Sequence, residues 1–225
     1  MPNKNVFLGE LTRKELGEAI SSGVIQGVLV PTGACEQHHD HLAMIHDAAS
    51  VTEIAQRVAM HFYPHVLVTP TISMSVSEHH MKHGGALTIR PDIYLEYVHD
   101  VCHSLKRLGV PKVMVLNGHG GNMRRNLEPV VPEQMKKLDA LGVTYLTYWE
   151  VCPGPFFEAH LESDRSAGHA GEFETSFAMV AFPQRIRPDQ ITYDSAKLAT
   201  IPKGGHILDV VVEGVIERVR QVLET

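Results

Sequence analysis

Histidines, carboxylates and glycines gather in three short segments of the chain. The first is EQHHDHLAMIHD at 36–47, the second is NGHGGN at 117–122, and the third is GHAGEFETS at 168–176. Imidazole nitrogens and carboxylate oxygens together form a ligand set that zinc and manganese ions favour. If the fold brings the three segments together, the sequence predicts a site for divalent metal ions and for the proton transfers that histidine performs.

Each segment alone also has a plain structural interpretation. Segment 36–47 would serve equally as a solvated polar loop, because short histidine-rich runs are common on surfaces. In segment 117–122, glycines on both sides of His119 let the backbone turn tightly, and the Lys-Ser/Thr ending of a nucleotide-binding loop is missing. At 168–176, acidic residues would complement a helix dipole. That role explains one glutamate well, but it explains His169 poorly.

The composition is that of an ordinary globular protein. Of the 225 residues, 44% are hydrophobic, and 20 Lys+Arg stand against 26 Asp+Glu. The basic residues are scattered rather than gathered in a stripe, so we expect no nucleic-acid partner. No run of about 18 apolar residues is present to span a bilayer, and the start of the chain lacks the apolar stretch of a secretory signal. We therefore expect a cytoplasmic protein without a membrane partner. Cys35, Cys102 and Cys152 have no CxxC spacing, and we expect them to be reduced.

The elements that must position these residues alternate along the chain. Short apolar runs predict strands, and apolar residues at i, i+3, i+4 and i+7 predict helices. We expect strands at 24–30, 65–70, 112–117 and 143–149. We expect helices at 48–62, 90–108, part of 123–141, 168–182 and 205–223.

Strands that alternate with helices predict one α/β domain over residues 1–225, a three-layer α/β/α fold with a mainly parallel central sheet. In such sheets, ligands gather at the loops beyond the carboxyl ends of the strands. Each histidine-bearing segment follows a predicted strand. We therefore expect the three segments to converge at that edge of the sheet.

Taken in order, the three segments resemble the motifs of the creatininase (creatinine amidohydrolase) family. The resemblance rests on Glu36-Gln37-His38 with Asp47, on Asn117-Gly118-His119-Gly120-Gly121-Asn122, and on His169-Ala170-Gly171-Glu172-Phe173-Glu174-Thr175-Ser176. It extends from about Val28 to Ala181, and three motifs in the same order are far more specific than any one of them. The resemblance implies a creatininase-like fold and a homo-oligomer, commonly a hexamer.

The resemblance also implies a site for two divalent metal ions, which would be Zn, Mn or Fe. The ligands that it implies are Glu36 and His119 for one ion, His38 and Glu172 for the other, and Asp47 as a bridge between both. In creatininase itself the second carboxylate looks to come from the asparagine–glycine–histidine motif, where this chain has Gly121. Glu172 is therefore assigned to that role, and the chain resembles a branch of the family other than creatininase proper.

Two ions about 4 Å apart would hold a bridging hydroxide against a polarised carbonyl, which supplies the nucleophile for hydrolysis. His169 is the expected proton shuttle to the departing nitrogen, because the ordinary pKa of histidine lies near neutrality. Glu174 is the second expected catalytic residue and would orient His169. A plain helix-stabilising role for Glu174 is an equally good explanation.

The expected substrate contacts are His79, His80 and Trp149. For the two histidines, the alternatives are an additional ion or a subunit contact, and for Trp149 the alternative is core packing. Three further histidines are interpreted as neighbours of the site or surface residues rather than ligands: His39, His41 and His46.

The sequence thus predicts a metal-dependent hydrolase that cleaves the carbon–nitrogen bond of a small-molecule amide, cyclic amide or formamide, and not a peptide bond. The motifs do not separate this activity from that of a deformylase of a formylamino-pyrimidine or of a peptide-processing relative. A protein that binds metal without turnover is a hypothesis of another class, although such a protein has no need of His169 as a shuttle. His83-Gly84-Gly85-Ala86 replaces the usual Phe-Pro-Gly-Thr of the family, which indicates a remodelled pocket wall. The substrate is therefore open.

Overall fold

A parallel sheet forms the centre of the computed structural model, which describes residues 5–163 and 165–225. Its 4 strands lie in the order β2-β1-β3-β4 and span Gly27–Thr32 (β1), Val66–Val68 (β2), Lys112–Asn117 (β3) and Thr144–Thr147 (β4). In the central pair, Gly27 lies opposite Lys112 and Thr32 lies opposite Asn117. All three pairings are parallel, so the sheet predicted from the apolar runs is confirmed.

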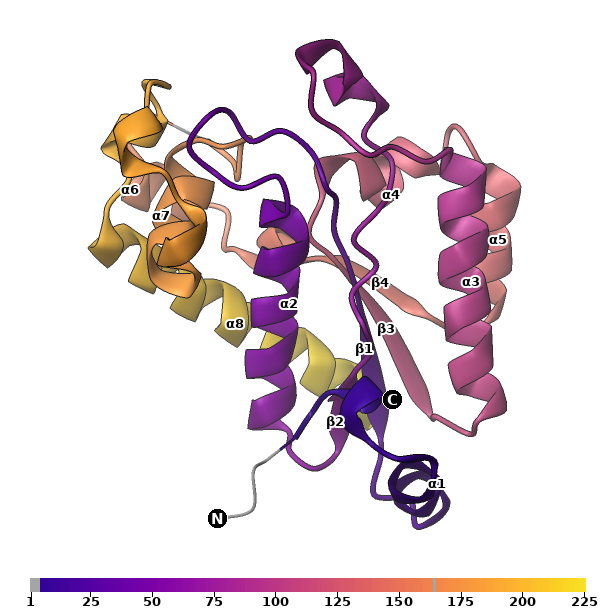
Figure 1. The fold of residues 1–225 in the computed structure, drawn as a ribbon. Helices are drawn as coiled ribbons and strands as arrows, with labels where there is room; N and C mark the ends of the chain where they lie inside the picture. The colour runs from indigo at the N-terminus through magenta and orange to yellow at the C-terminus, as the bar shows by residue number, and fades with distance from the viewer. Residues whose placement is uncertain (1–4, 164) are drawn as a thin grey trace.

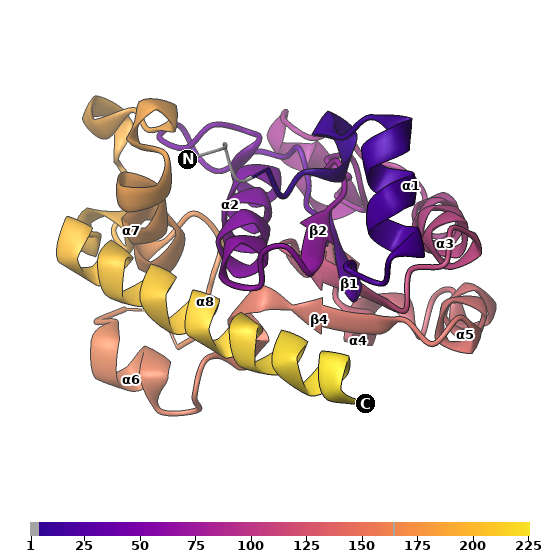
Figure 2. The same ribbon diagram turned by 90° about the horizontal axis from the view of Figure 1, so that it is seen from below.

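Helices cover both faces of this sheet (Figure 1). One face carries α2 (His46–His61), α7 (Glu172–Ala181) and α8 (Ile201–Glu224), and the other carries α1 (Arg13–Ser21), α3 (Pro91–Arg107) and α5 (Pro132–Ala140). Figure 2 shows α8 running alongside β4, with α1, α3 and α5 gathered on the other side. Within β1, Leu29 joins the core on the α2 side, whereas Val28 and Val30 join the core on the α3 side. Burial on both faces explains why β1, β2 and β3 are mainly apolar runs, whereas the edge strand β4 is only partly buried.

The remaining elements are short and lie in the connections. They are α4 (Arg124–Leu127), α6 (Phe156–His160) and the 3₁₀ helices η1 (Leu8–Glu10), η2 (Glu78–His83), η3 (Gly120–Asn122), η4 (Tyr148–Val151), η5 (Pro183–Arg185), η6 (Pro188–Gln190) and η7 (Ala196–Leu198). None of the helices within the described ranges is long and apolar enough to cross a membrane. The three cysteines are free thiols.

Several element boundaries differ from the sequence expectation, each for a local reason. The helix expected at 168–182 begins only at Glu172, because Gly168 (φ 67°) and Ala170 (φ 50°) are left-handed and cannot lie in an α-helix. The helix expected within 123–141 is divided into α4 and α5, and Pro132, which lacks a backbone N–H, begins the second one. The last strand ends at Thr147. Helix α1 was not expected, although a capping box between Thr12 and Glu15 marks its start.

The loops that follow β1, β2 and β3 leave the sheet at its carboxyl edge, and the first turn of α2 lies at the same edge (Figure 1). These loops carry the histidines of segments 36–47 and 117–122, together with the histidines of η2. The edge at which parallel α/β proteins bind ligands is therefore the edge where the chemistry-bearing residues lie.

Candidate metal centre

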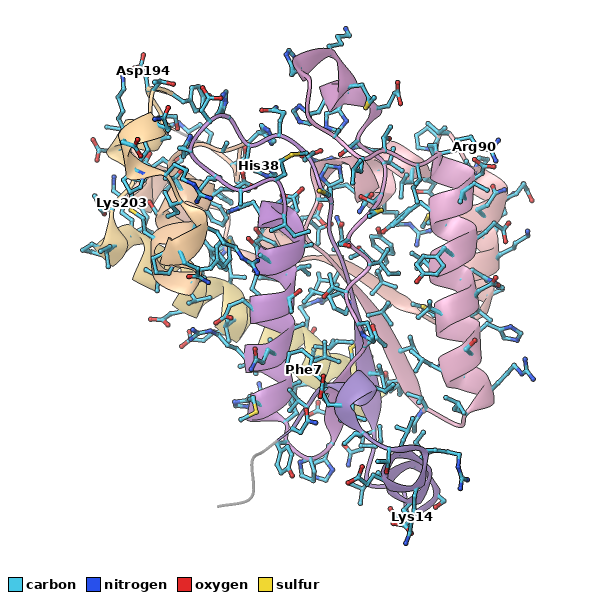
Figure 3. The ribbon with its side chains drawn as sticks, in the orientation of Figure 1. Phe7, Lys14, His38, Arg90, Asp194 and Lys203 are labelled. Atoms are coloured by element: carbon cyan, nitrogen blue, oxygen red, sulfur yellow. The ribbon has the colours of Figure 1, made fainter. Side chains whose placement is uncertain are left out.

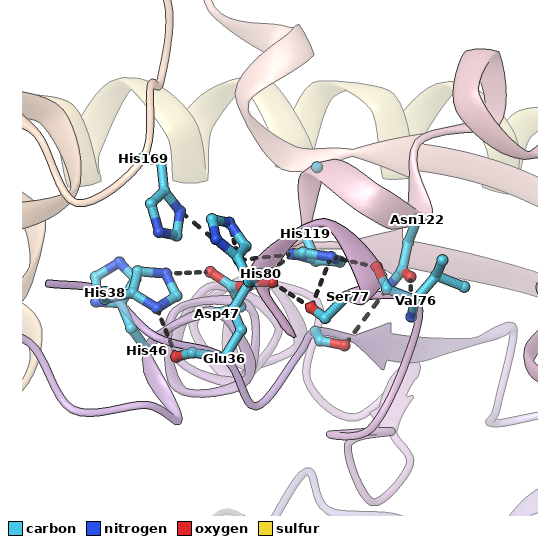
Figure 4. Close-up of polar contacts among 12 residues, drawn as sticks. Glu36, His38, His46, Asp47, Val76, Ser77, His80, His119, Asn122 and His169 are labelled. Atoms are coloured by element: carbon cyan, nitrogen blue, oxygen red, sulfur yellow. Dashed lines mark hydrogen bonds and ion pairs between the residues drawn. The ribbon is translucent and has the colours of Figure 1, made fainter. Parts of the chain in front are cut away.

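Asp47 lies in the middle of a buried cluster of imidazoles and carboxylates. It belongs to the first turn of α2, and its two oxygens contact histidines from two different loops (Figure 4). Oδ1 of Asp47 lies 2.9 Å from Nε2 of His38, and Oδ2 lies 2.9 Å from Nδ1 of His119. None of these three side chains is more than 4% exposed. Segments 36–47 and 117–122 therefore converge as the sequence predicted.

The loop after β1, which carries His38, is held by the loop after β2. Residues 35–37 run beside residues 85–87, where the N–H of Leu87 donates to the carbonyl of Cys35 at 2.9 Å and the N–H of Gln37 donates to that of Gly85. A Cβ at Gly85 would lie only 3.1 Å from Cβ of Gln37, so glycine suits the close approach of the two loops. In this setting, Nδ1 of His38 donates to the carbonyl of Glu36 at 3.1 Å, which leaves Nε2 as an acceptor that faces Asp47.

His119 is fixed in a similar way from the other side of the cluster. The amide of Asn117, the last residue of β3, accepts from the N–H of His119 at 3.1 Å and donates to its carbonyl at 2.8 Å. Nε2 of His119 donates to the carbonyl of Val76 at 2.8 Å, so Nδ1 is the accepting nitrogen, and it faces Asp47. A ring held through its outer nitrogen by a backbone carbonyl is the usual arrangement of a metal-binding histidine.

This donor set requires a positive charge. With the ring protons placed as above, the lone pairs of His38 and His119 each face a carboxylate oxygen at 2.9 Å, so that two acceptors oppose one another. Burial lowers the pKa of both imidazoles, but the charge of Asp47 and its hydrogen bonds outweigh that effect and raise the pKa of His38 to about 9 and that of His119 to about 10. Burial likewise raises the pKa of Asp47, and the two histidines outweigh it and hold that pKa well below its usual range. A site that binds cations so readily fits a divalent metal ion as well as a proton.

Glu36 extends the cluster on the His119 side. Its Oε1 lies 3.4 Å from Nδ1 of His119, and the hydroxyl of Ser77 donates to its Oε2. The potential ligand atoms of Glu36, His38 and Asp47 all lie within 4.8 Å of one another. Sequence reasoning did not single out Ser77, because nothing in its type or spacing marks it as a neighbour of Glu36.

Glu174 extends the cluster on the other side. Its carboxylate is buried, and Oε2 lies 3.8 Å from Nε2 of His38. Burial raises the pKa of Glu174 to about 8 against the opposing charge of His38. Potential ligand atoms of His38, His169 and Glu174 lie within 4.8 Å of one another, so the third segment reaches the centre through this glutamate.

Glu172, the ligand that the sequence nominated, does not reach the cluster. Its Oε2 accepts hydrogen bonds from the backbone N–H groups of Glu162 and Ser163 at 2.9 and 3.0 Å, and its Oε1 pairs with the ammonium of Lys203. No ligand group in the described part of the chain includes it. The reason is helical geometry, because residues two positions apart in a helix point roughly 200° apart. Figure 3 shows His38 beside the first turn of α2 and Lys203 at the outer margin of the molecule.

His169 lies over Glu36, and its Nδ1 is 3.6 Å from Oε1 of that carboxylate. Burial and the nearby charge of His38 lower the pKa of His169 to about 3. The ring of His80 stacks on it with centroids 4.3 Å apart and places Nε2 also 3.6 Å from Oε1 of Glu36. The amide nitrogen of Gln37 contacts both rings, at 2.7 Å from Nδ1 of His80 and 3.0 Å from Nε2 of His169. Sequence reasoning missed this contact, because Gln37 entered only as the middle residue of a motif.

A cavity of about 420 Å³ lies over this part of the cluster, and its described lining comprises Gln37, His39, Asp40, His80, His83 and His169. His79 belongs instead to the wall of a second cavity, of about 380 Å³, beside Gly120 and Gly121. One of its ring nitrogens lies within 4.8 Å of potential ligand atoms of Glu36 and His119. The two expected substrate contacts in η2 thus face the centre from two sides.

The other side chains considered from the sequence belong to none of the groups of potential ligand atoms in the described part of the chain. Trp149 is in η4 and packs against the hydrophobic core, with its ring 4.9 Å from that of Tyr148, which agrees with the packing alternative. Nε2 of the buried His41 contacts Oγ1 of Thr175 at 2.9 Å. The ring of His46 lies 4.8 Å from that of His38, and burial lowers its pKa well below the usual value.

The sequence as a whole matches one known protein family. The profile of that family, described as creatininase, creatinine amidohydrolase, matches residues 9–218. The chain belongs to the creatininase family. It is 26% identical to creatinine amidohydrolase from Pseudomonas putida, over 97% of this chain and 98% of that protein. It is also 26% identical to the mycofactocin precursor peptide peptidase of Mycobacterium ulcerans, over 85% of this chain and 76% of that protein.

Solved creatininase structures share the fold. The crystal structure of creatinine amidohydrolase (creatininase) superposes with a TM-score of 0.83 over 97% of this chain and 98% of that one, at 27% identity. Similar structures include creatininase in a form named for Mn and a mutant in a form named Zn-Zn. The predicted α/β fold is confirmed, and the chain is an enzyme of the amidohydrolase class, as its motifs predicted.

Within this creatininase-family site, Gly121 is the position to which the sequence comparison drew attention. A Cβ at Gly121 would overlap the carbonyl oxygen of Val76 and come within 2.5 Å of Nε2 of His119. The chain therefore leaves no room for a side-chain ligand there. Among the described carboxylates, Glu174 is the one that approaches His38 from the opposite side of the cluster.

Proposed function

We propose that this enzyme hydrolyses the carbon–nitrogen bond of a small amide, cyclic amide or formamide at a centre of two divalent metal ions. One observation carries the proposal: the two oxygens of Asp47 each face the accepting nitrogen of a different histidine at 2.9 Å. A buried carboxylate in that position is suited to bridge two cations, because each oxygen has its own partner nitrogen. Membership of the creatininase family supports the reaction class.

The proposed ligands divide on either side of Asp47. Glu36 and His119 would hold one ion together with Oδ2 of Asp47, and His38 and Glu174 would hold the other together with Oδ1. Glu174 replaces Glu172 in this assignment because of its approach to His38. Nitrogen and carboxylate donors suit Zn, Mn and Fe alike, and creatininase forms named for Mn and Zn support the first two.

Two divalent ions at such a centre would acidify a water molecule and polarise a carbonyl group. Residues of the chain supply the proton transfers. Burial and the charge of His38 lower the pKa of His169 to about 3, well below the near-neutral value expected from the sequence, so this imidazole is neutral at neutral pH. Its proposed role rests on its position over Glu36 and not on that pKa. We propose that His169 takes the proton of the nucleophile and passes it to the departing nitrogen, which needs a proton to leave. Glu174 helps to hold His169 in place. The N–H of Ala170, the residue after His169, donates to Oε2 of Glu174 at 2.6 Å.

The substrate would enter the cavity of about 420 Å³, which is within the usual size range of small-molecule sites. His80 would contact the substrate there, and His79 would contact it from the second cavity. Trp149 is not among the proposed contacts, because it is half-buried and packs against the hydrophobic core.

A peptide is the second candidate substrate. The two cavities, of about 420 and 380 Å³, are both lined by residues of η2, and together they would give an extended chain room in two places. The likeness to the mycofactocin precursor peptide peptidase supports the same candidate. A phosphorylated formylamino-pyrimidine is less well supported, because the described lining of neither cavity contains an arginine or lysine to bind a phosphate.

The proposal is tested by metal analysis combined with a panel of lactams, cyclic ureides, formamides and short peptides. The enzyme is expected to contain two ions per chain and to hydrolyse at least one substrate class. His169→Ala should lose roughly 10²- to 10⁴-fold in kcat while it keeps its ions. His103→Ala, at an exposed position of α3, is the matched control and should behave as the wild type. A fully metal-loaded protein that hydrolyses no member of the panel would favour metal binding without turnover.

We further propose that residues 1–225 act as one domain and assemble into a homo-oligomer, a hexamer by family resemblance. Light scattering of the purified protein measures the assembly directly. A monomer at micromolar concentration would refute it.

A further inference from the structure

The loop that carries His169 is closed on itself by one buried side chain. Glu172 begins α7 at one end of this loop, and its Oε2 reaches back to the other end. There it accepts from the N–H groups of Glu162 and Ser163 at 2.9 and 3.0 Å, and from the hydroxyl of Ser163 at 3.1 Å. The N–H of Glu172 donates to Oγ of Ser195 at 3.0 Å, and that hydroxyl lies 2.7 Å from the hydroxyl of Ser163.

Lys203 of α8 completes this closure. Its ammonium pairs with Oε1 of Glu172, which is fully buried, and also donates to the carbonyl of Leu198 at 3.0 Å and to Glu162 at 2.7 Å. The lysine side chain is itself only 20% exposed. A buried carboxylate is tolerated when it is paired and hydrogen-bonded. The bonds of Glu172 to Glu162 and Ser163 join it to the far end of the loop, and its bond to Lys203 joins it to α8.

The loop needs such a restraint because its backbone is strained beside the catalytic histidine. Ala170 has a φ of 50°, a left-handed conformation that costs a residue with a Cβ roughly 1 kcal/mol or more. A conformation of this kind persists only where its surroundings fix it. Glu174 fixes Ala170 from the side of the metal centre, and Glu172 fixes the loop from its two ends. His169 lies between these two restraints, with Nδ1 3.6 Å from Glu36.

We propose that Glu172 and Lys203 are positioning residues for His169: their ion pair ties Glu162 and Ser163 to the start of α7 and so holds the imidazole over Glu36. The inference rests on the proposed function in one respect, that His169 transfers a proton during turnover. It gives Glu172 a role in place of metal binding. A misplacement of a reacting group by about 1 Å can cost roughly 10²-fold in rate, so the restraint is expected to affect kcat more than the binding of metal or substrate.

The test uses the zinc-loaded enzyme with Lys203→Met, and Lys197→Met as the matched control. Lys197 forms a neighbouring ion pair with Asp194 that is exposed, with side chains 54% and 95% accessible. Lys203→Met should lower kcat roughly 10- to 10²-fold with KM and zinc content unchanged, and it should speed hydrogen exchange in peptides that cover residues 165–171. Lys197→Met should leave all four quantities as in the wild type. If Lys203→Met does not fold, Glu172→Gln, which keeps the hydrogen-bond acceptor and loses the charge, takes its place.

Lys203→Arg supplies the rescue, because it keeps a charged donor, and it should recover most of the lost kcat. Any one of three results would overturn the inference: Lys203→Met has the kcat of the wild type, its hydrogen exchange in the loop is unchanged, or it loses zinc in proportion to activity. If the wild-type enzyme hydrolyses nothing while Lys203→Met still speeds exchange in the loop, the proposed function fails and the closure by Glu172 and Lys203 stands.

Discussion

Replacing each of the two glutamates of the third segment by glutamine separates the metal ligand from its neighbour. Glu174 lies 3.8 Å from Nε2 of His38 inside the cluster, whereas Glu172 is bonded to Lys203 and to the backbone at 162 and 163. Loss of a residue that only supports a ligand weakens metal binding roughly 10- to 10²-fold. Loss of a ligand should weaken metal binding at least 10²-fold, which corresponds to about 2.7 kcal/mol of binding free energy.

Glu174→Gln is therefore expected to lose one of two ions during dialysis against a moderate chelator, and Glu172→Gln is expected to keep both. Glu172→Gln should instead lower the free energy of unfolding by about 2 kcal/mol, because a buried hydrogen bond to a charged group is weakened. Plasma mass spectrometry measures the metal content, and urea unfolding followed by circular dichroism measures the free energy of unfolding. If Glu174→Gln keeps both ions and Glu172→Gln loses one, Glu174 is not the ligand, and the sequence-based assignment of Glu172 as the ligand is correct.

Three further predictions follow from the surroundings of the centre. In chelator-stripped protein, the pKa of His38 is about 9 and that of His119 is about 10, both above the ordinary 6.5. Protonation of these two histidines therefore stabilises the folded protein fully below pH 6.5, and this stabilisation is lost as the pH rises through 9 and 10. The urea concentration at the midpoint of unfolding should fall as the pH rises through 9 and 10 in metal-free protein, and it should stay constant in metal-loaded protein. A midpoint that rises in metal-free protein would contradict the reasoning. Gly121→Ala should lower the free energy of unfolding by about 1–3 kcal/mol and reduce the metal content, because the added Cβ would meet Val76 and His119. Gly120→Ala is the control, because open space surrounds that position, and it should change neither quantity. Trp149→Phe should lower unfolding free energy by about 1 kcal/mol and leave KM unchanged, and a raised KM would return Trp149 to the substrate pocket.

The sheet could be predicted from the sequence because β1, β2 and β3 are buried on both faces. Leu29 faces one core and Val30 the other, so the strand is a continuous apolar run that hydrophobicity alone reveals. The convergence of His38, Asp47 and His119 was equally predictable, since loops at the carboxyl ends of parallel strands share one edge. These features depend on local pattern and on a general property of parallel sheets.

The choice between Glu172 and Glu174 could not be made from the sequence. Both glutamates fit the motif, and which of them faces His38 depends on where α7 begins. That start is set by the left-handed conformation of Ala170, which is not a residue type that signals positive φ. The partner of Glu172 is Lys203, 31 residues further along the chain, and no local pattern announces such a pair.

The contacts of Gln37 and Ser77 were missed for a related reason. Gln37 meets His80 and His169, which come from two other loops, and Ser77 meets Glu36 across 41 positions of the sequence. Polar residues of this kind gain a role only from tertiary contacts. Their types and spacing are those of ordinary loop residues.

The central claim is that Asp47 bridges two metal ions, and the metal content of Asp47→Asn tests it most directly. Asparagine keeps the shape of the side chain but removes the charge between His38 and His119, which it faces at 2.9 Å on either side. Wild-type protein purified without chelator should contain two divalent ions per chain, and a folded Asp47→Asn variant should contain fewer than one. Two ions retained in that variant would contradict the account.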